Sequence, residues 1–278
     1  MTGGGDAGVR AELQSRVTAL LLGAIADAGF VLAGAGAIRQ HGLTDRPTDD
    51  VDLFTVPTTT AEQFGAALDA AETALRGAGF EVSRSRVSES FARFQLRRAL
   101  DGEDVLEVDF GINWRADPPV AMSVGPVLSE RDAVAGKLSA VYSRGEVRDF
   151  LDLDSIRSTG RFTDSELVAL GEEHDGGFDM GLFAAQLSRI TTILPTQAAQ
   201  YDVTADEFAQ VQARILAWAV ELRDTASTGN TGAGPRIRTT PPAKSPRPPG
   251  AAERSSPPGA DWLGRSSGAW SDPPGPSL

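Results

Sequence analysis

Hydrophobic and polar positions follow two different spacings along the first part of the chain. Apolar residues three and four apart over residues 9–28 predict an amphipathic helix. Short apolar runs at residues 30–33 and 51–56 predict two strands of a buried sheet. Residues 60–76 begin with Thr-Ala-Glu-Gln, the sequence of a capping box, and predict a second long helix.

Strand-like runs continue beyond this helix and then give way to helical spacing. Three further strands are expected, at residues 80–86, 91–96 and 105–110. After Pro126 the apolar spacing is helical, with capping boxes at residues 163–166 and 204–207. The pattern therefore predicts an α+β domain over residues 1–127 and a helical domain over residues 128–226.

The last part of the chain has no periodic apolar pattern. Residues 227–278 hold 11 of the 17 prolines. Such a segment buries too little apolar surface to offset the entropy that it would lose on ordering. We expect a disordered Pro/Gly/Ser-rich tail. Its six Lys and Arg against three acidic residues leave both RNA contact and simple solvation open.

Composition narrows the chemistry that the chain can perform. Its 278 residues include 26 Lys and Arg against 38 Asp and Glu, a formal net charge of −12. This acidity argues against a protein that coats nucleic acid through bulk charge. The absence of Cys excludes disulfides, thiolate zinc sites and a cysteine nucleophile, and two His residues are too few for histidine-rich metal chemistry. Chemistry must therefore rest on carboxylates, Lys, Arg and backbone amides.

The sequence has no pattern typical of a signal peptide or a membrane-spanning helix. Its most apolar stretch, residues 19–38, is interrupted by Asp27 and by several glycines. We therefore expect a cytoplasmic protein that does not bind a membrane.

Two carboxylates mark the second predicted strand. Residues two apart share a face of a strand, so Asp50 and Asp52 point one way while the apolar residues between and after them point into the core. Two carboxylates a few ångströms apart repel each other unless a cation lies between them. Their oxygen ligands suit Mg²⁺ or Mn²⁺ rather than zinc. An isolated Asp-x-Asp pair on a strand, however, is more often only solvated.

A later strand repeats this arrangement. In residues 104–110, DVLEVDF, Glu107 and Asp109 share the face opposite to the apolar side chains. If this strand lies beside the first pair, Asp109 completes a three-carboxylate cluster that holds two metal ions for an in-line phosphoryl or nucleotidyl displacement. Asp109 would then also take the proton from the attacking hydroxyl, with Glu107 as the competing candidate.

A glycine-containing turn precedes the Asp pair. Without side chains, Gly34 and Gly36 let backbone N–H groups approach a triphosphate at the start of a short helix over residues 37–41. A tight strand–helix turn explains the same glycines, and the two interpretations are compatible. His41, at the end of this helix, is as consistent with a local cap as with catalysis.

Charged residues with helical spacing follow Pro126. Lys137 and Arg144 are seven residues apart and share a helix face. Two cations that face a carboxylate–metal site would neutralise a triphosphate and the leaving pyrophosphate. Asp149 and Asp152 would orient these cations. Ordinary surface salt bridges are the alternative; we favour the functional interpretation for Lys137 and leave the other three open.

Five arginines lie within fifteen residues that contain one acid: Arg84, Arg86, Arg93, Arg97 and Arg98. Strand alternation places Arg93 and Arg97 on one face. A local basic patch beside an acidic site is what an enzyme with an RNA acceptor needs. A strand edge protected by charge explains it equally well.

Three other polar residues have local explanations as well. Arg46 and Thr48 precede the Asp pair, and they either contact phosphate or fix the turn around Pro47. His174 lies at an acidic helix end, where we expect it to be exposed to solvent.

In combination, these motifs resemble the nucleotidyltransferase signature of the DNA polymerase β-like superfamily: a glycine-containing turn, an Asp-x-Asp and a later strand Asp. More specifically, they resemble the AbiEii/AbiGii toxin family, in which a GG-x-AL turn, an R-(S/T)-x-D-(I/V)-D-L strand and a K…R…RDF-x-DL helix recur. Here residues 46–53 read RPTDDVDL, and Lys137 and Arg144 precede RDFLDL at residues 148–153. The resemblance covers residues 28–190.

This resemblance implies a mixed-sheet nucleotidyltransferase domain followed by a helical domain, with the active site in the cleft between them. It implies metal-dependent transfer of a nucleoside monophosphate from an NTP to an acceptor hydroxyl. The enzyme would be the toxin of a toxin–antitoxin or phage-exclusion system that acts on tRNA, with a separate antitoxin. The implied catalytic residues are Asp50, Asp52, Asp109 and Lys137, the first three also as metal ligands. The implied nucleotide-binding residues are Gly34, Ala35, Gly36, Arg46, Thr48, Lys137, Arg144, Asp149 and Asp152.

Two other functions stay open. One is nucleotidylation of a small molecule, such as an antibiotic hydroxyl, or of a protein. The second is a catalytically lapsed member that binds only nucleotide or a partner protein. Ala35 motivates it, because this residue stands where the family usually has a second glycine. A methyl group there would crowd a phosphate if the position needed a positive φ.

Overall fold

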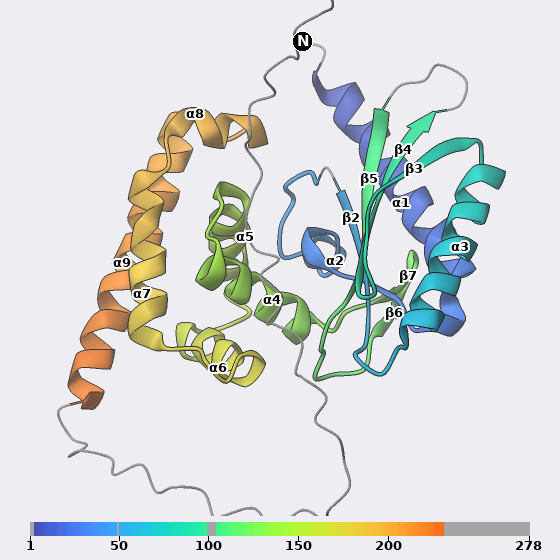
Figure 1. The fold of residues 1–278 in the computed structure, drawn as a ribbon. Coiled ribbons are helices and arrows are strands. Elements are labelled where there is room, and N and C mark those ends of the chain that lie inside the picture. The colour runs from blue at the N-terminus through green and yellow to red at the C-terminus, as the bar shows by residue number, and fades with distance from the viewer. Residues whose placement is uncertain (1–2, 49, 99–103, 231–278) are drawn as a thin grey trace, which may run out of the picture. The chain divides into compact units, whose positions relative to one another are not determined.

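The computed structural model describes residues 3–48, 50–98 and 104–230 (Figure 1). Its first part contains, in chain order, α1 (Gly3–Ala24), the 3-10 helix η1 (Ala26–Ala28), β1 (Val31–Leu32), α2 (Gly34–Gln40), β2 (Asp50–Thr55), α3 (Ala61–Gly77), β3 (Phe80–Val87), β4 (Phe91–Arg98), β5 (Asp104–Ile112), β6 (Val120–Met122) and β7 (Gly125–Val127). The second part is helical: α4 (Glu130–Ser143), α5 (Val147–Ser158), α6 (Asp164–His174), α7 (Met180–Ser188), η2 (Arg189–Thr192), α8 (Pro195–Ala198), η3 (Ala199–Tyr201) and α9 (Ala205–Asn230). The α+β class and each strand and helix expected over residues 9–110 are thus confirmed, with ends shifted by a few residues.

The chain divides by its internal contacts into residues 1–226 and residues 227–278. The boundary expected between residues 127 and 128 lies inside the first unit and stays a prediction. The proposed disordered tail lies outside the described residues, apart from the four residues that end α9.

Capping boxes start three helices where the sequence places them. At α3, the N–H of Gln63 donates to Thr60 Oγ1 at 3.2 Å, and the N–H of Thr60 donates to Gln63 Oε1 at 2.9 Å. The same reciprocal bonds join Thr163 to Glu166 before α6 and Thr204 to Glu207 before α9. Each box gives a hydrogen-bond acceptor to two backbone N–H groups that would otherwise be unpaired at the start of the helix.

The sheet is mixed, as the resemblance implied. Among the described residues it has seven strands in the order β3-β4-β5-β2-β1-β7-β6. Strand β2 runs parallel to β5 and β1 runs parallel to β7, whereas the other neighbours are antiparallel. Strands β6 and β7 were not predicted from the sequence, because three residues are too few to show an alternation of apolar and polar side chains. Pairing of Leu32 with Val127 places β7 beside β1.

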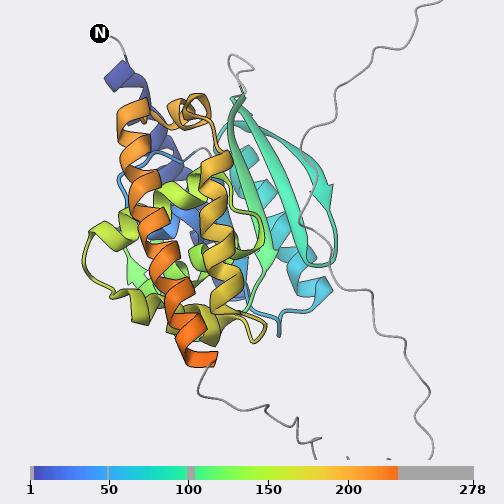
Figure 2. The same cartoon turned by 90° about the vertical axis from the view of Figure 1, so that its left-hand side faces the viewer.

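Helices α1 and α3 pack together on one face of this sheet (Figures 1 and 2). Beneath them, the rings of Phe30, Phe64, Phe94 and Phe110 are fully buried, with centroids 4.8 to 6.0 Å apart in the contacting pairs. The opposite face is left for polar side chains of β2, β4 and β5. Helices α2 and α4 pack against each other on that side of the molecule, and α5–α9 lie beyond them (Figure 1).

We expect Phe110→Ala to lower the free energy of unfolding by about 3–5 kcal/mol, because the ring is fully buried between Phe30 and Phe94. Val87→Ala, at a side chain that is 57% exposed, should change it by less than about 0.5 kcal/mol. Urea denaturation followed by circular dichroism measures both. Equal effects of the two substitutions would contradict the position assigned to the core.

Candidate active site

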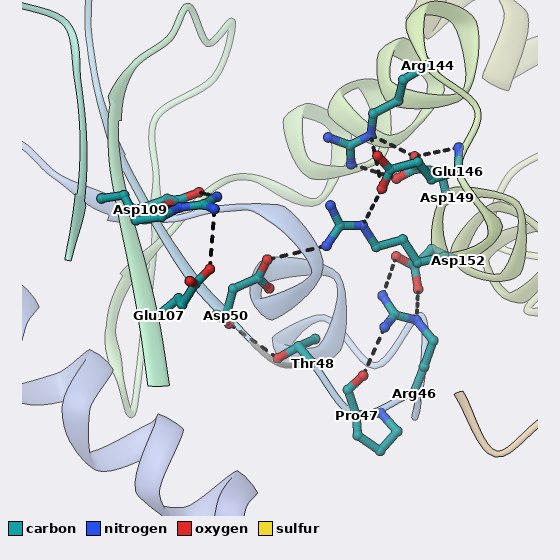
Figure 3. Close-up of polar contacts among 12 residues, drawn as sticks. Arg46, Pro47, Thr48, Asp50, Glu107, Asp109, Arg144, Glu146, Asp149 and Asp152 are labelled. Atoms are coloured by element: carbon teal, nitrogen blue, oxygen red, sulfur yellow. Dashed lines mark hydrogen bonds and ion pairs between the residues drawn. The ribbon is translucent and has the colours of Figure 1, made fainter. Parts of the chain in front are cut away.

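Strands β2 and β5 bring the carboxylates together. Because the two strands pair in parallel, Asp50 lies opposite Glu107 and Asp52 lies opposite Asp109. The alternate residues are buried in the core: Val51, Leu53, Val108 and Phe110. The strand that holds Asp109 thus lies beside the strand that holds Asp50 and Asp52, as the predicted cluster requires, and the carboxylates share one face of the two strands. Figure 3 shows Asp50, Glu107 and Asp109 on that face.

The turn between β1 and α2 lies directly against this cluster. Gly34 has a φ of +55°, and a Cβ there would lie 1.8 Å from Oδ2 of Asp52, so only glycine fits. Gly36 serves packing instead, because its Cβ would lie 2.9 Å from Cδ1 of Leu32. The φ of Ala35 is not positive, and its methyl group is buried within α2. The crowding that motivated a lapsed enzyme does not arise from the backbone at this position.

The carboxyl group of Asp52 has a strongly raised pKa. Burial, together with the charges of Asp50 and Asp109, raises its pKa to about 7, against the opposing charges of Lys137 and Arg148. A carboxyl group with a pKa near neutrality takes up either a proton or a cation at physiological pH. The cluster therefore lacks part of the positive charge that it needs.

Oxygen donors of this kind fit a hard divalent cation such as Mg²⁺ or Mn²⁺. As the side chains stand, no three Asp, Glu, His or Cys residues of the described segments are arranged to bind a metal. Both oxygens of Asp109 accept hydrogen bonds, from Nε and Nη2 of Arg93 at 2.7 and 2.6 Å. Asp50 and Asp52 are therefore the residues most open to a cation. Glu107 is 42% exposed and contacts Nη1 of Arg93 at 3.3 Å.

An arginine from the helical part reaches the same cluster. Nη1 of Arg148, at the start of α5, lies 3.5 Å from Oδ2 of Asp50, and Nε lies 3.0 Å from Oε2 of Glu146. Although it lies within ion-pair distance of Glu146, the buried Nε atom of Arg148 makes no hydrogen bond. The sequence analysis did not select Arg148 as a site residue. A signal was present, since Arg148 precedes Asp152 by four residues and so shares its face of α5.

Asp152 joins the two parts of the molecule. Its fully buried carboxylate accepts hydrogen bonds from Nε and Nη2 of Arg46 at 2.8 and 2.9 Å, and lies 2.7 Å from Nζ of Lys137. Burial alone would lower the pKa of the Arg46 guanidinium, but the hydrogen bonds and the charge of Asp152 raise that pKa above its ordinary value. The guanidinium also lies 5.2 Å from the ring centroid of Tyr201. Arg46 thus fixes the loop before β2 against α5, as Figure 3 shows.

Arg144 pairs with Asp149, one of the two carboxylates that the sequence suggested would orient it. Its Nε and Nη2 donate to Asp149 at 2.8 and 2.9 Å, and the N–H of Glu146 donates to the same carboxylate at 3.2 Å (Figure 3). Burial alone would raise the pKa of Asp149, but Arg144 and Lys137 hold it below the ordinary value. Nζ of Lys137 is 3.8 Å from Asp149. Asp149 and Asp152 therefore orient the cations around them, and a contact of Arg144 with nucleotide stays a prediction.

The remaining polar candidates contact other groups of the protein. Thr48 is buried, and its hydroxyl lies 3.3 Å from Oε1 of Gln14, whose Nε2 donates to the Thr48 carbonyl. His41 ends α2 as its C-cap residue, but its Nε2 contacts the carbonyl of Leu128, 87 positions along the chain, at 2.8 Å, so the ring is not a local cap. His174, expected to be exposed, is half-buried, and its ring centroid lies 5.7 Å from that of Trp114.

The arginines of β3 and β4 divide between the two faces of the sheet. Arg84 turns toward α3, where it pairs with Glu72 and Asp69 at 2.6 and 2.7 Å. Arg93 lies on the carboxylate face, and a register shift pairs Arg86 with it across the strands. The predicted basic patch therefore loses Arg84.

The sequence matches the family model "Nucleotidyl transferase AbiEii toxin, Type IV TA system" over residues 20–226. The chain belongs to the AbiEii toxin family. This membership, together with the fold, makes it a nucleotidyltransferase of a toxin–antitoxin family. No protein with a curated function matches the sequence significantly. Among the described residues of this AbiEii member, no helix is both long and apolar enough to cross a membrane.

Solved structures with a similar fold are distant in sequence. JHP933 from Helicobacter pylori is 18% identical, with a TM-score of 0.47 over 80% of this chain and 94% of that chain. MenT4, a nucleotidyltransferase toxin from Mycobacterium tuberculosis H37Rv, is 18% identical, with a TM-score of 0.49 over 79% and 87%. Cid1, which has RNA terminal uridylyl transferase activity, is 12% identical, with a TM-score of 0.32 over 69% of this chain and 49% of that chain.

Because the pKa of Asp52 is raised in the folded state, the unfolded chain gives up this proton at lower pH. Between pH 5 and 8 the metal-free AbiEii protein should therefore lose stability as pH rises, and Asp52→Asn should flatten that slope. Urea denaturation in a chelator at pH 5, 6, 7 and 8 measures it. Added Mn²⁺ should flatten the wild-type slope as well. Identical slopes for wild type and Asp52→Asn would contradict the assigned charge balance.

Proposed function

We propose that this AbiEii member transfers a nucleoside monophosphate from an NTP to a hydroxyl group of tRNA or another RNA. The observation that carries the proposal is the parallel register of β2 and β5, which aligns Asp52 with Asp109 beside Asp50. The helical part presents Lys137 and Arg148 toward this cluster, since both lower the pKa of Asp52 through their charge. Carboxylates for metal and proton, and cations for phosphate, are the groups that nucleotidyl transfer requires.

In the proposed reaction, the acceptor oxygen forms a bond to the α-phosphorus of the NTP. The bond from that phosphorus to the oxygen bridging the β-phosphate breaks, and pyrophosphate leaves. The hydroxyl proton passes to Asp109, which is buried opposite Asp52, rather than to the more exposed Glu107. A divalent ion held by Asp50 and Asp52 would polarise the phosphate oxygens.

The cations of the helical part would bind the phosphates. Lys137 is 6% exposed, and Asp152 holds its ammonium group, so this charge is placed before the substrate arrives. A preorganised cation costs little reorganisation when charge develops on the leaving group. The contact of Arg148 with Asp50 is long, at 3.5 Å, so a phosphate could take the place of Asp50 at Nη1 while Nε stays 3.0 Å from Glu146.

The acceptor would approach along the uncovered face of β3 and β4. Arg86 and Arg97 are exposed there, beside the carboxylates and on the opposite face from α3. Basic side chains in this position suit the phosphates of an RNA strand whose terminal hydroxyl reaches Asp109. As the family name indicates a toxin–antitoxin system, we propose a separate antitoxin protein as the partner of this chain.

Asp50→Asn should reduce transfer of label from an α-labelled NTP to RNA by about 100-fold or more, because one metal ligand is lost. Asp69→Asn is the matched control: this carboxylate lies on α3 and is 74% exposed. Purified protein, Mg²⁺, each NTP in turn and total cellular RNA are incubated and separated on a gel. No transfer by the folded wild-type protein to any acceptor would contradict the proposal.

Arg86→Gln combined with Arg97→Gln should raise the KM for RNA several-fold and reduce the slope of log affinity against log salt by about 2, with little change in the KM for NTP. Arg84→Gln, on the α3 face, should change neither value. Steady-state kinetics at several salt concentrations measure both. Unchanged RNA kinetics in the double variant, with transfer to a small molecule or protein retained, would support the alternative acceptor instead.

A catalytically lapsed member would bind nucleotide without turning it over. Calorimetry with each NTP and Mg²⁺, combined with the transfer assay, separates this alternative from an active enzyme. Binding with no transfer to RNA, protein or small hydroxyl acceptors would support it.

A further inference from the structure

Arg93 makes an unusually complete contact with one carboxylate of the cluster. It lies directly across from Asp109 in the antiparallel pairing of β4 and β5. Both oxygens of Asp109 accept hydrogen bonds from its guanidinium, at 2.7 and 2.6 Å, and Glu107 lies 3.3 Å from it. The Asp109 side chain is 11% exposed. A two-point contact of this kind fixes the carboxylate in both position and direction.

The contact differs from that of a residue which merely orients a metal ligand. An orienting partner binds one atom of the ligand and leaves another for the metal. Arg93 engages both oxygens of Asp109 and also brings a positive charge to the place where a cation would approach. Two cations in this confined space repel each other, so Arg93 and a metal ion exclude one another at Asp109.

The other end of the cluster lacks such a contact. At Asp50, Arg148 reaches only one oxygen, at 3.5 Å, and the Asp50 side chain is 24% exposed. The cluster therefore has one end open to a cation and one end already neutralised by an arginine.

We propose that Arg93 is a positioning residue that competes with a divalent cation for Asp109. The protein without substrate then binds one divalent ion, at Asp50 and Asp52, while Arg93 supplies the positive charge at Asp109. This proposal rests on the metal-dependent function proposed above, but it concerns metal binding and not transfer. It assigns Arg93 to the metal site rather than to the RNA-binding patch in which the sequence placed it.

Mn²⁺ binding to the full chain in the absence of nucleotide tests this proposal. Free Mn²⁺ is measured by electron paramagnetic resonance during titration, and folding is checked by circular dichroism. Arg93→Gln should tighten Mn²⁺ binding by about ten-fold or add a second bound ion. Arg84→Gln is the matched control, because Arg84 also pairs with two carboxylates but on the opposite face. It should leave Mn²⁺ binding unchanged.

The sign of the change separates competition from orientation. If Arg93 only orients Asp109, its removal weakens binding by about 10- to 100-fold, the range for outer partners of metal ligands. Weaker or unchanged Mn²⁺ binding in folded Arg93→Gln would overturn the proposal. Arg93→Lys keeps the charge but loses the two-point contact, so it should tighten Mn²⁺ binding by less than Arg93→Gln does. If Arg93→Gln does not fold, this variant decides alone: unchanged or weaker Mn²⁺ binding in folded Arg93→Lys would overturn the proposal.

A second pair of variants isolates the contact from the fold. In an Asp109→Asn background, adding Arg93→Gln should no longer tighten Mn²⁺ binding, and a ten-fold gain there would overturn the proposal. Asp52→Asn distinguishes the two proposals from each other. If wild type and Asp52→Asn bind Mn²⁺ equally weakly, the metal-dependent function fails. If Asp52→Asn weakens Mn²⁺ binding but Arg93→Gln does not tighten it, only the competition fails.

Discussion

The crowding of carboxylates on two neighbouring strands is the constraint on which the rest of the site depends. Parallel pairing of β2 and β5 places Asp50, Asp52, Glu107 and Asp109 on one face, where like charges repel unless cations compensate them. The protein meets this need from two directions. Strand β4 supplies an arginine to Asp109, and the helical part supplies a lysine and an arginine that act on Asp50 and Asp52. The remaining deficit is what a divalent ion would fill.

The same electrostatic need ties the helical part to the sheet. Asp152 is fully buried between Arg46, from the loop before β2, and Lys137, from α4. Removing one partner of such a group would leave an uncompensated buried charge. Arg46 therefore holds the loop before β2 against α5, and its contact with a phosphate stays a prediction. Lys137, held by the same carboxylate, gains a fixed position that a free lysine side chain would not have.

The sequence predicted local features well and distant contacts less well. Alternation identified Asp50, Asp52 and Asp109, and the capping boxes marked the helix starts, because these signals lie within a few residues. Whether β5 lies beside β2 depended on strand order, which no local spacing determines. The contact of Arg148 with Asp50 joins residues 98 positions apart, so the spacing of Arg148 to Asp152 within α5 could not predict it. Strands β6 and β7 were too short to show a period, and the division of Arg84 from Arg86 followed from a register shift within the hairpin.

Diffraction from crystals grown with Mn²⁺ and a non-hydrolysable NTP analogue tests the central claim most directly. Anomalous scattering locates manganese independently of any assumption about its ligands. We expect the anomalous peak to show a manganese ion bound by oxygens of Asp50 and Asp52, with the analogue's phosphates contacting Lys137. A bound analogue whose phosphates lie away from Lys137, or manganese held by other residues, would contradict it.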